Sequence, residues 1–548
     1  YSQAKGFESR HELAVVVQQM VDSEISGVLF SADPVSGNRG VMVGNFVRGI
    51  GDTLVSGETS GQAFKFERPT GEYAGPDELL FIARNMFNLA ERVEREFGSP
   101  QDIEWAIADQ RLYLLQSRPI TTLRDENLTS GEWNASLSGD FLWSNVNFGE
   151  AVTSVMTPLS WTVLRYILKD WMNFSGYHPV GNICGRPYLN ISLFATALYT
   201  IGKTKADLLT SFESTLYMNL PDEVEIPQLP LSRWERLSAL PGVARSMLRQ
   251  QRGLKKLSPY LDSNPSWCLH MRTRIQASNS TEGLLGLWFQ EIDPHVLESV
   301  WIVLGSATTA ADSAMQLLRD LTDLVGADDA HTLVSSLSTR SNAGQNHGLL
   351  LSLGPLSGLS KVSRREMARS EYIARYGHRG PDEFELSVPR PAEDPSWLDQ
   401  QLAQFQASPV DVDAMLEKQH LAFETAWARL ERDHPKKAKN LQRRIDQVAS
   451  LAHQREMARS EYIRDRWVVR TFAVRAGELT GLGEEVFFLT LQEVLDMLAG
   501  DDLAVEYIPV RKETHTRYSA LPPYPSIIRG CFDPSQWAAD PHRRSDYF

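Results

Sequence analysis

Four polar residues, close together in the sequence, could bind a phosphate group and its metal ion. They are Asp102, Glu104, Gln116 and Arg118. Carboxylate and amide oxygens are the hard ligands that Mg²⁺ prefers, and an arginine beside them can neutralise a phosphate oxygen. A face that carried all four would suit a nucleoside triphosphate. On pattern alone, however, a two-stranded ribbon with a solvated polar face is the simpler interpretation.

A β-hairpin is the element that must position these side chains. Polar or small residues alternate with apolar ones over 102–107, and a similar alternation runs over 112–118. A three-residue loop at 109–111 would set Glu104 opposite Gln116 and Asp102 opposite Arg118. The same register would set Trp105 opposite Leu115 and Ile107 opposite Tyr113 on the apolar face.

The two halves of this hairpin closely resemble the end of the ATP-binding domain in the pyruvate phosphate dikinase and phosphoenolpyruvate synthase family. The matching stretches are Asp-Ile-Glu-Trp-Ala at 102–106 and Leu-Tyr-Leu-Leu-Gln-Ser-Arg-Pro-Ile-Thr at 112–121. In that family the Glu and the Gln bind the metal ion on ATP, and the Arg contacts phosphate. The resemblance therefore implies ATP and Mg²⁺ as cofactors, Glu104 and Gln116 as metal ligands, and Arg118 as a phosphate contact.

Three apolar runs upstream, at 13–21, 27–32 and 41–46, predict strands of the same domain. In the family the first of them lies along the adenine, so the resemblance implies that Gln18, Gln19 and Met20 contact the base. Met20 fits a hydrophobic core equally well. The segment 49–57 matches a glycine-bearing family segment, but Asp52 replaces the usual Glu, which argues against a metal role there.

Two helical regions follow from the periodicity. Apolar residues recur every three or four positions between Leu79 and Phe97, which predicts a scaffold helix that Pro76 and Asp77 open. From about Trp133 to about Asp502 the chain reads as mainly helical. The candidate helices cover 159–169, 230–257, 281–287, 312–325, 398–407, 414–431 and 439–474.

Motifs in this helical region resemble the antibiotic-binding domain of rifamycin phosphotransferases. They include the segments 143–150, 157–161 and 376–387. The resemblance implies a rifamycin-type small molecule as partner and a phosphoryl carrier histidine on a separate swivelling domain. We find no sequence motif for that histidine in this chain, so we expect no catalytic residue here and an inactive fragment. The Pro-rich segment 511–548 predicts an extended linker toward that domain.

Two features of the helical region suggest weaker candidates for the substrate site. His378 could line a pocket or have a structural role. The nine residues Arg-Glu-Met-Ala-Arg-Ser-Glu-Tyr-Ile occur at 365–373 and again at 455–463. The second copy lies where the family has basic residues near the substrate, so Arg455 and Arg459 are candidates too. Two exposed helix turns with paired charges would explain the repeat equally well.

Composition narrows the class of protein. A formal net charge of −14 argues against nucleic acid as the main partner. No apolar run reaches the roughly 18 residues that a membrane-spanning helix needs, and we expect a cytoplasmic protein. Three distant cysteines indicate neither a disulfide framework nor a zinc site.

Taken together, the sequence predicts an α+β chain. Residues 1–122 would form the second half of an ATP-grasp domain, 123–510 a helical substrate domain and 511–548 the linker. The expected activity is transfer of a phosphoryl group from ATP to a hydroxyl of a rifamycin, with release of AMP and phosphate. The alternatives are an enzyme like phosphoenolpyruvate synthase, which would use pyruvate, and a non-catalytic module that binds nucleotide or a hydrophobic ligand.

Overall fold

The computed structural model describes residues 20–34, 41–49, 61–97, 100–120, 126–335, 354–407 and 411–548, except 69, 147, 150–151, 173, 175, 206–207 and 209–223. The chain divides into two compact units, Tyr1–Arg124 and Asp125–Phe548. Helices and antiparallel sheets occur together, which confirms the predicted α+β class. In the described part of the chain, no helix is both long and apolar enough to cross a membrane.

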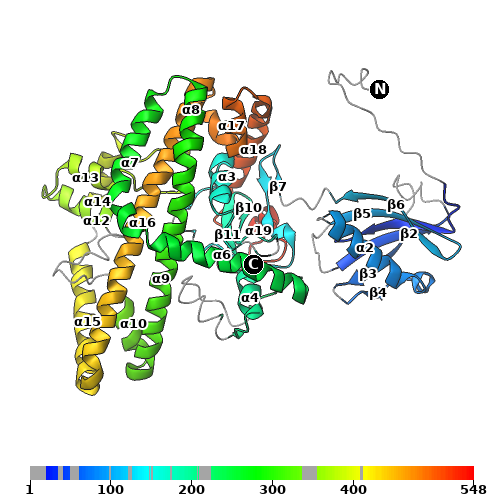
Figure 1. Ribbon diagram of the computed structural model, residues 1–548, viewed down its shortest axis with the longest axis horizontal. Helices are drawn as coiled ribbons and strands as arrows, with labels where there is room; N and C mark the ends of the chain where they lie inside the picture. The colour runs from blue at the N-terminus through cyan, green and yellow to red at the C-terminus, as the bar shows by residue number, and fades with distance from the viewer. Residues whose placement is uncertain are drawn as a thin grey trace. The chain divides into compact units, whose positions relative to one another are not determined.

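A six-stranded antiparallel sheet forms the N-terminal unit, in the strand order β4-β3-β2-β1-β5-β6 (Figure 1). Strands β1 and β2 confirm two of the three predicted strands, while the run at 13–21 lies almost wholly outside the described residues. The strands are β1 (Ile25–Phe30), β2 (Val41–Arg48), β3 (Gln62–Glu67), β4 (Glu72–Ala74), β5 (Gln101–Ala108) and β6 (Arg111–Pro119).

Helix α2 (Ala83–Phe97) covers one face of this sheet. Its Met86 and Phe87 are buried against Phe66 and Trp105 of the strands. The predicted start at Asp77 is wrong, because Asp77–Leu79 form a separate 3₁₀ turn, η2, before the helix begins. That turn still buries Leu79, so the apolar periodicity continues across the break and conceals it.

The C-terminal unit combines a small sheet with a large helical part. Its four-stranded sheet has the order β10-β11-β9-β12, and a two-stranded ribbon joins β7 to β8. The strands are β7 (Glu126–Asn127), β8 (Glu132–Trp133), β9 (Leu142–Ser144), β10 (Val180–Ile183), β11 (Arg186–Asn190) and β12 (Ile527–Arg529).

The helices of this unit occupy most of the remaining chain. They are α3 (Pro158–Ile167), α4 (Ile191–Thr200), α6 (Arg233–Leu254), α7 (Leu257–Ala277), α8 (Thr281–Leu287), α9 (Asp293–Val325), α10 (Ala327–Ser335), α12 (Gly354–Ser363), α13 (Arg369–Tyr376), α14 (Trp397–Ala407), α15 (Val412–Asp433), α16 (Pro435–Thr480), α17 (Leu491–Leu498), α18 (Ile508–Ser519) and α19 (Pro534–Ala539). Short turns of other helical types are η4 (Ala135–Ser138), η5 (Trp288–Ile292), η7 (Gly483–Phe488) and η8 (Leu503–Tyr507).

Helix α16 is the central helix of the helical part, against which several other helices pack. It is 46 residues long and packs against both α7 and α9 (Figure 1). The largest hydrophobic core of the unit lies between these helices, α8, α17 and α3. The sequence did not predict α7, because Pro265 interrupts the helical pattern, yet the helix continues through that residue.

The predicted linker at 511–548 is part of this fold. Strand β12 pairs with β9, and the side chains of Tyr524, Phe532 and Trp537 are buried together in one hydrophobic cluster. The prediction of an extended linker is therefore wrong for this segment. Its prolines separate short packed elements rather than keep the chain away from the core.

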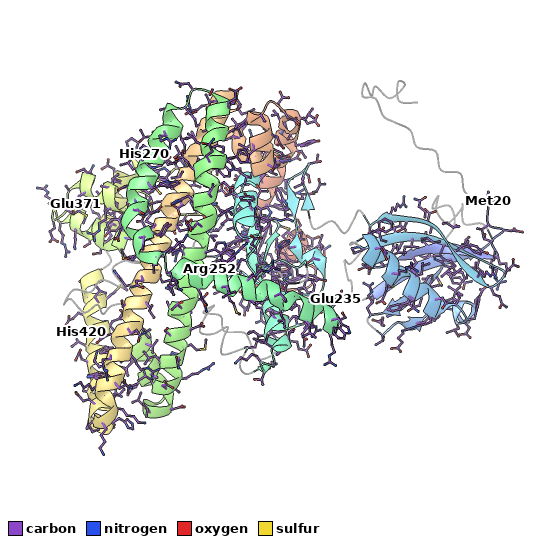
Figure 2. The ribbon with its side chains drawn as sticks, in the orientation of Figure 1. Met20, Glu235, Arg252, His270, Glu371 and His420 are labelled. Carbon is purple, nitrogen blue, oxygen red and sulfur yellow. The ribbon has the colours of Figure 1, made fainter. Side chains whose placement is uncertain are left out.

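The two copies of the nine-residue repeat adopt different structures. In the first copy, Arg365 has a φ of 60° and the helix begins only at Arg369, whereas the second copy lies entirely within α16. Glu371 projects from the surface of the first copy (Figure 2), and Glu461, its counterpart in the second, is buried. The interpretation of two exposed helix turns is therefore wrong for the second copy.

Candidate functional site

The hairpin β5–β6 brings together the four polar residues that the sequence singled out. Glu104 lies opposite Gln116 and Asp102 opposite Arg118, as predicted. The predicted loop is wrong, however. It contains two residues, Asp109 and Gln110, with φ values of 49° and 57°, as in a type I′ turn.

A β-bulge reconciles the shorter loop with the predicted pairs. Trp105 pairs with Leu114 and Ile107 with Leu112, so the register shifts between Glu104 and Trp105. The extra residue on β6 is Leu115. Because a bulge inserts one extra residue into one strand, it restores the alignment of Gln116 with Glu104 that a two-residue loop would otherwise lose.

An ion pair joins the two other members of the group. Nε of Arg118 donates to Oδ2 of Asp102 over 2.8 Å, and this hydrogen bond raises the pKa of Arg118. The Asp102 side chain is 10% exposed and that of Arg118 is 58% exposed. Oδ1 of Asp102 is buried and has no hydrogen-bond partner in the protein. A free carboxylate oxygen therefore remains beside the Glu104–Gln116 pair, and a buried acceptor of this kind is costly unless it is satisfied.

The residues fit the implied Mg²⁺ ion in their chemistry. Glu104 contributes carboxylate oxygens, Gln116 an amide oxygen and Asp102 its unpartnered Oδ1, and all are hard ligands. Across the described parts of the chain, no group of three or more His, Cys, Asp and Glu side chains could hold a metal ion by itself. A metal ion at this face would therefore share its coordination with ligand oxygens, as Mg²⁺ commonly does with nucleotide phosphates.

The same face of the sheet continues as an apolar strip onto β1. Val28 is the neighbour of Glu104 and Phe30 the neighbour of Asp102, and both apolar side chains are half-buried. On β2, Asn45 follows Val28 in the same row. This face lies opposite α2, which packs on the other side of the sheet. A flat apolar strip beside a polar edge can accommodate a planar ring and a charged group together.

Of the three residues predicted to contact the base, the structure describes only Met20. Gln18 and Gln19 lie outside the described residues, as does Asp52 of the glycine-bearing segment. Met20 is described and is 85% exposed, at the edge of the N-terminal unit (Figure 2). The alternative that Met20 belongs to a hydrophobic core is therefore wrong, and its contact with a base stays a prediction.

The three substrate candidates lie close together on the C-terminal unit. His378 is buried, and its Nε2 lies 2.8 Å from the hydroxyl of Ser460 in α16. Burial, together with the nearby charges of Arg464 and Arg379, lowers the pKa of His378 well below its ordinary value. This histidine therefore has a neutral ring at physiological pH.

Both arginine candidates are engaged with carboxylates. Nη2 of Arg455 lies 2.7 Å from Glu456, and Nη2 of Arg459 lies 3.5 Å from the buried Glu383. The Arg459 side chain remains 36% exposed, so it can reach an external ligand as well. A role for these residues in substrate binding stays a prediction.

A second polar cluster beside α16 was missed by the sequence reasoning. Asp465 is fully buried and accepts hydrogen bonds from the hydroxyl of Tyr260 at 2.7 Å and from the thiol of Cys268 at 3.3 Å. Nε2 of His295 lies 3.2 Å from Oδ1 of Asp465 and 2.9 Å from Oδ1 of Asn264. The His295 ring stacks on Trp267, with the ring centroids 3.5 Å apart.

These contacts determine the tautomer of His295. The side-chain amide nitrogen of Asn264 donates to Glu461, so its oxygen faces the histidine as an acceptor, and Asp465 is an acceptor as well. Nε2 must therefore carry the proton, and Nδ1 of the neutral ring keeps a free lone pair. A histidine held by a buried aspartate in this way is arranged as a general base. No sequence motif marked this pair, because its members are 170 residues apart.

A separate depression of about 340 Å³ lies beside the middle of α6. Its lining includes Asp170, Ser238, Arg245 and Arg249. This depression contains none of the candidate residues. It also differs from the large apolar pocket that a bulky hydrophobic substrate would need.

Comparisons with known families match two parts of the chain, one that contains the hairpin and one in the helical part. Residues 1–81 and 81–136 match the family model described as pyruvate phosphate dikinase, AMP/ATP-binding domain. Residues 313–456 match the model described as rifampicin phosphotransferase fourth domain. The chain is related to the phosphoenolpyruvate synthase and pyruvate phosphate dikinase family.

The relatives that align with most of this chain have low sequence identity to it, and a relative of higher identity aligns with only a small part. The prodigiosin synthesizing transferase PigC of Serratia marcescens is 24% identical over 92% of this chain and 66% of its own length. The rifampicin phosphotransferase of Bacillus subtilis is 23% identical over 96% of this chain and 67% of its own length. The phosphoenolpyruvate synthase of Pyrococcus furiosus is 32% identical, over only 23% of this chain and 20% of its own. The chain thus spans about two thirds of the length of its long relatives.

Proposed function

We propose that this chain is the nucleotide-binding and acceptor-binding part of an ATP-dependent dikinase-type phosphotransferase. The observation that carries the proposal is the alignment of Glu104 with Gln116, next to the Asp102–Arg118 ion pair, on the face of the N-terminal sheet opposite α2. The family match over residues 1–136 supports a nucleotide as the ligand of this face. We infer ATP, with Mg²⁺, as that ligand.

The residues of this face would bind different parts of the nucleotide and its metal ion. Glu104 and Gln116 would hold the Mg²⁺ ion, which neutralises charge on the phosphates and orients them for transfer. Arg118 would bind a phosphate oxygen, and it can do so without leaving Asp102 because only its Nε is used in the ion pair. Val28 and Phe30 would contact the apolar part of the nucleotide.

For the acceptor we propose a hydroxyl group of a rifamycin-type molecule, bound by the C-terminal unit. The match of residues 313–456 to a rifampicin phosphotransferase domain and the long alignment with a rifampicin phosphotransferase support this choice. An enzyme that uses pyruvate is less well supported, because the match to phosphoenolpyruvate synthase covers only a quarter of the chain. The similar alignment with PigC makes another small organic acceptor the main competitor.

His295 is the group in the described part of the C-terminal unit that is best arranged to activate such a hydroxyl. In the proposed transfer, Nδ1 of His295 takes the hydroxyl proton while the acceptor oxygen bonds to phosphorus and the bond from phosphorus to the carrier histidine breaks. Asp465 stabilises the imidazolium that results. The carrier belongs to a separate swivelling domain, as the family resemblance implies. His378 is unsuited to carrying the phosphoryl group, because its ring is buried and hydrogen-bonded to Ser460.

Calorimetric titration of the chain tests both halves of the proposal. We expect ATP to bind with one-to-one stoichiometry and more tightly in the presence of Mg²⁺. Rifampicin should bind independently of ATP, and pyruvate should show no heat of binding. Binding of ATP that ignores Mg²⁺ would refute the metal assignment. Saturable binding of pyruvate without rifampicin binding would refute the acceptor.

A further inference from the structure

Two arginines in the interior of the C-terminal unit lack ionic partners. Arg466 lies in the middle of α16 and is 0% exposed, and Arg390 lies between α13 and α14 and is 1% exposed. Their guanidinium groups donate to the backbone carbonyls of three consecutive residues. Nη2 of Arg390 donates to Glu383 at 2.9 Å and to Glu385 at 3.4 Å, and Nη2 of Arg466 donates to Phe384 at 3.1 Å. The two cations therefore lie beside one another.

Most of the hydrogen-bonding capacity of this arginine pair is unused. Nε and Nη1 of Arg390, and Nε and Nη1 of Arg466, are buried and have no acceptor in the protein. Neither guanidinium forms an ion pair with any described carboxylate. Four nitrogen donors are thus enclosed without an acceptor, although each buried unsatisfied donor costs about 1–3 kcal/mol. The two positive charges are offset only at a distance, by Glu383 and Glu393 at Arg390 and by Glu385 at Arg466.

The nearby carboxylates are already engaged elsewhere. Glu383 pairs with Arg379 and Arg459. Glu385 accepts hydrogen bonds from the hydroxyls of Thr157 and Ser160, both at 2.8 Å.

The third carboxylate, Glu393, is also occupied. It binds Arg470 at 2.7 Å and the indole nitrogen of Trp467 at 2.9 Å. Glu385 and Glu393 therefore cannot move to Arg390 or Arg466 without abandoning hydrogen bonds of their own, and Oε2 of Glu383, which has no hydrogen-bond partner, stays in an ion pair with Arg459.

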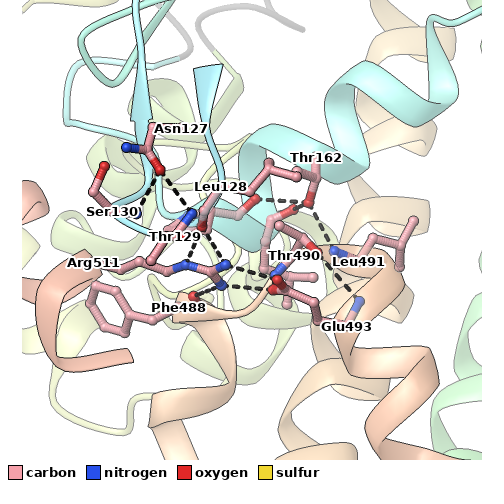
Figure 3. A network of polar contacts seen from close by, with 12 residues as sticks. Asn127, Leu128, Thr129, Ser130, Thr162, Phe488, Thr490, Leu491, Glu493 and Arg511 are labelled. Atoms are coloured by element: carbon pink, nitrogen blue, oxygen red, sulfur yellow. Dashed lines mark hydrogen bonds and ion pairs between the residues drawn. The ribbon is translucent and has the colours of Figure 1, made fainter. Parts of the chain in front are cut away.

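Arg511 shows how this fold satisfies a buried arginine when it contains the partners. Its side chain is fully enclosed, and Nε and Nη2 both donate to the carbonyl of Leu128 (Figure 3). Nη1 and Nη2 also bind the two carboxylate oxygens of Glu493, at 2.6 and 2.8 Å. Every nitrogen of Arg511 has an acceptor, and its charge has a counter-charge. The contrast makes the lack of partners at Arg390 and Arg466 a local property of their site.

The electrostatics of the site agree with an excess of positive charge. Burial lowers the pKa of Arg390 to about 10; repulsion from Arg466 and Arg470 adds to the effect, and attraction to Glu393 and Glu383 opposes it only in part. Nδ1 of His378, whose pKa is depressed partly by the charge of Arg390, is also buried without a partner. Water could accept the free hydrogen bonds, but it would add no negative charge to that of the neighbouring carboxylates. An anion supplies acceptors and counter-charge together.

We propose that Arg390 and Arg466 bind a small inorganic oxyanion of the phosphate or sulfate type inside the C-terminal unit. An oxyanion is the favoured class because the four free donors belong to two separate guanidinium groups, which need several acceptor atoms in one ligand. The anion would bind between α16 and the segment 383–393 and would hold them together. This site is independent of the proposed nucleotide site, which lies in the other unit.

Thermal unfolding of the full chain at constant ionic strength tests the site. Inorganic phosphate, added in place of a bulky organic anion, should raise the Tm of the C-terminal unit by a few degrees in a saturable way. Arg466→Met and Arg390→Met should each abolish this rise. Arg511→Met, the matched control, should lower the Tm in both buffers but keep the phosphate-dependent rise. Sulfate should act as phosphate does, whereas chloride should have less effect.

One further variant and two possible outcomes keep the test specific. Arg118→Met separates binding at the nucleotide face from binding in the interior, because the phosphate-dependent rise must persist in it. The inference is overturned if phosphate leaves the wild-type Tm unchanged, since water would then occupy the site. It is also overturned if Arg390→Met and Arg466→Met retain the full rise.

Discussion

Replacing Glu104 by glutamine tests the metal assignment with little change in shape. The substitution removes one negative charge and keeps the size and the strand position of the side chain. A carboxylate and a divalent ion about 4 Å apart attract by about 8 kcal/mol at an effective dielectric constant of 20, and by about 2 kcal/mol in bulk water. Glu104 is half-buried and the glutamine keeps an oxygen ligand, so the loss should lie near the lower limit, at about 2–3 kcal/mol. Binding of Mg·ATP should weaken roughly 30- to 150-fold.

The assay is calorimetric titration of ATP with and without Mg²⁺. Glu104→Gln should weaken binding only when the metal is present, because the carboxylate acts through the ion and would otherwise repel the phosphates. Glu67→Gln is the matched control, since Glu67 belongs to the same sheet and its carboxylate pairs with Lys65 at 2.8 Å. Equal affinity of wild type and Glu104→Gln for Mg·ATP, or an equal loss in Glu67→Gln, would refute the reasoning.

Three other predictions concern stability. Arg511→Met should destabilise the C-terminal unit by about 3–5 kcal/mol in urea unfolding, because it leaves a half-buried carboxylate without its cation. Lys512→Met, beside it on the surface, should cost less than about 1 kcal/mol, and similar losses in the two variants would contradict this account. Gly27→Ala should lower the Tm of the N-terminal unit, since a Cβ atom would stand 2.4 Å from a backbone oxygen of β2; an unchanged Tm would show that the sheet can adjust. Burial and Asp293 raise the pKa of Tyr166 to about 12. The native state then keeps a proton that the unfolded chain loses above about pH 10, so stability should fall between pH 10 and 12, and less steeply in Tyr166→Phe.

The hairpin shows what alternation in a sequence can and cannot predict. Period-two patterning identified both strands and the pairs Glu104–Gln116 and Asp102–Arg118, because side chains on one face must alternate. It could not reveal that the loop has two residues and that Leu115 compensates as a bulge. A loop one residue longer and a bulge of one residue produce the same pairing beyond the bulge, so the sequence pattern does not distinguish them.

Long-range contacts explain the remaining differences. The repeat shows this directly, because nine identical residues form a turn and a short helix at 365–373 but a continuous helix at 455–463. The second copy is helical throughout because α7 and α9 pack against it along α16, which overrides local preference. The His295–Asp465 pair escaped prediction for a related reason. Residues from separate helices meet only in the folded unit, and neither belongs to a recognisable motif.

The small sheet of the C-terminal unit joins the beginning of that unit to its end. The side-chain amide of Asn134, near the beginning of the unit, donates to the carbonyl of Phe532, near its end, over 2.9 Å. Strand β12 pairs with β9, and the amide of Phe548 donates to Ile527 at 3.0 Å. The chain therefore enters and leaves this unit at one anchor point. The small sheet, rather than the helices between, therefore sets the distance between the first and last segments of the unit.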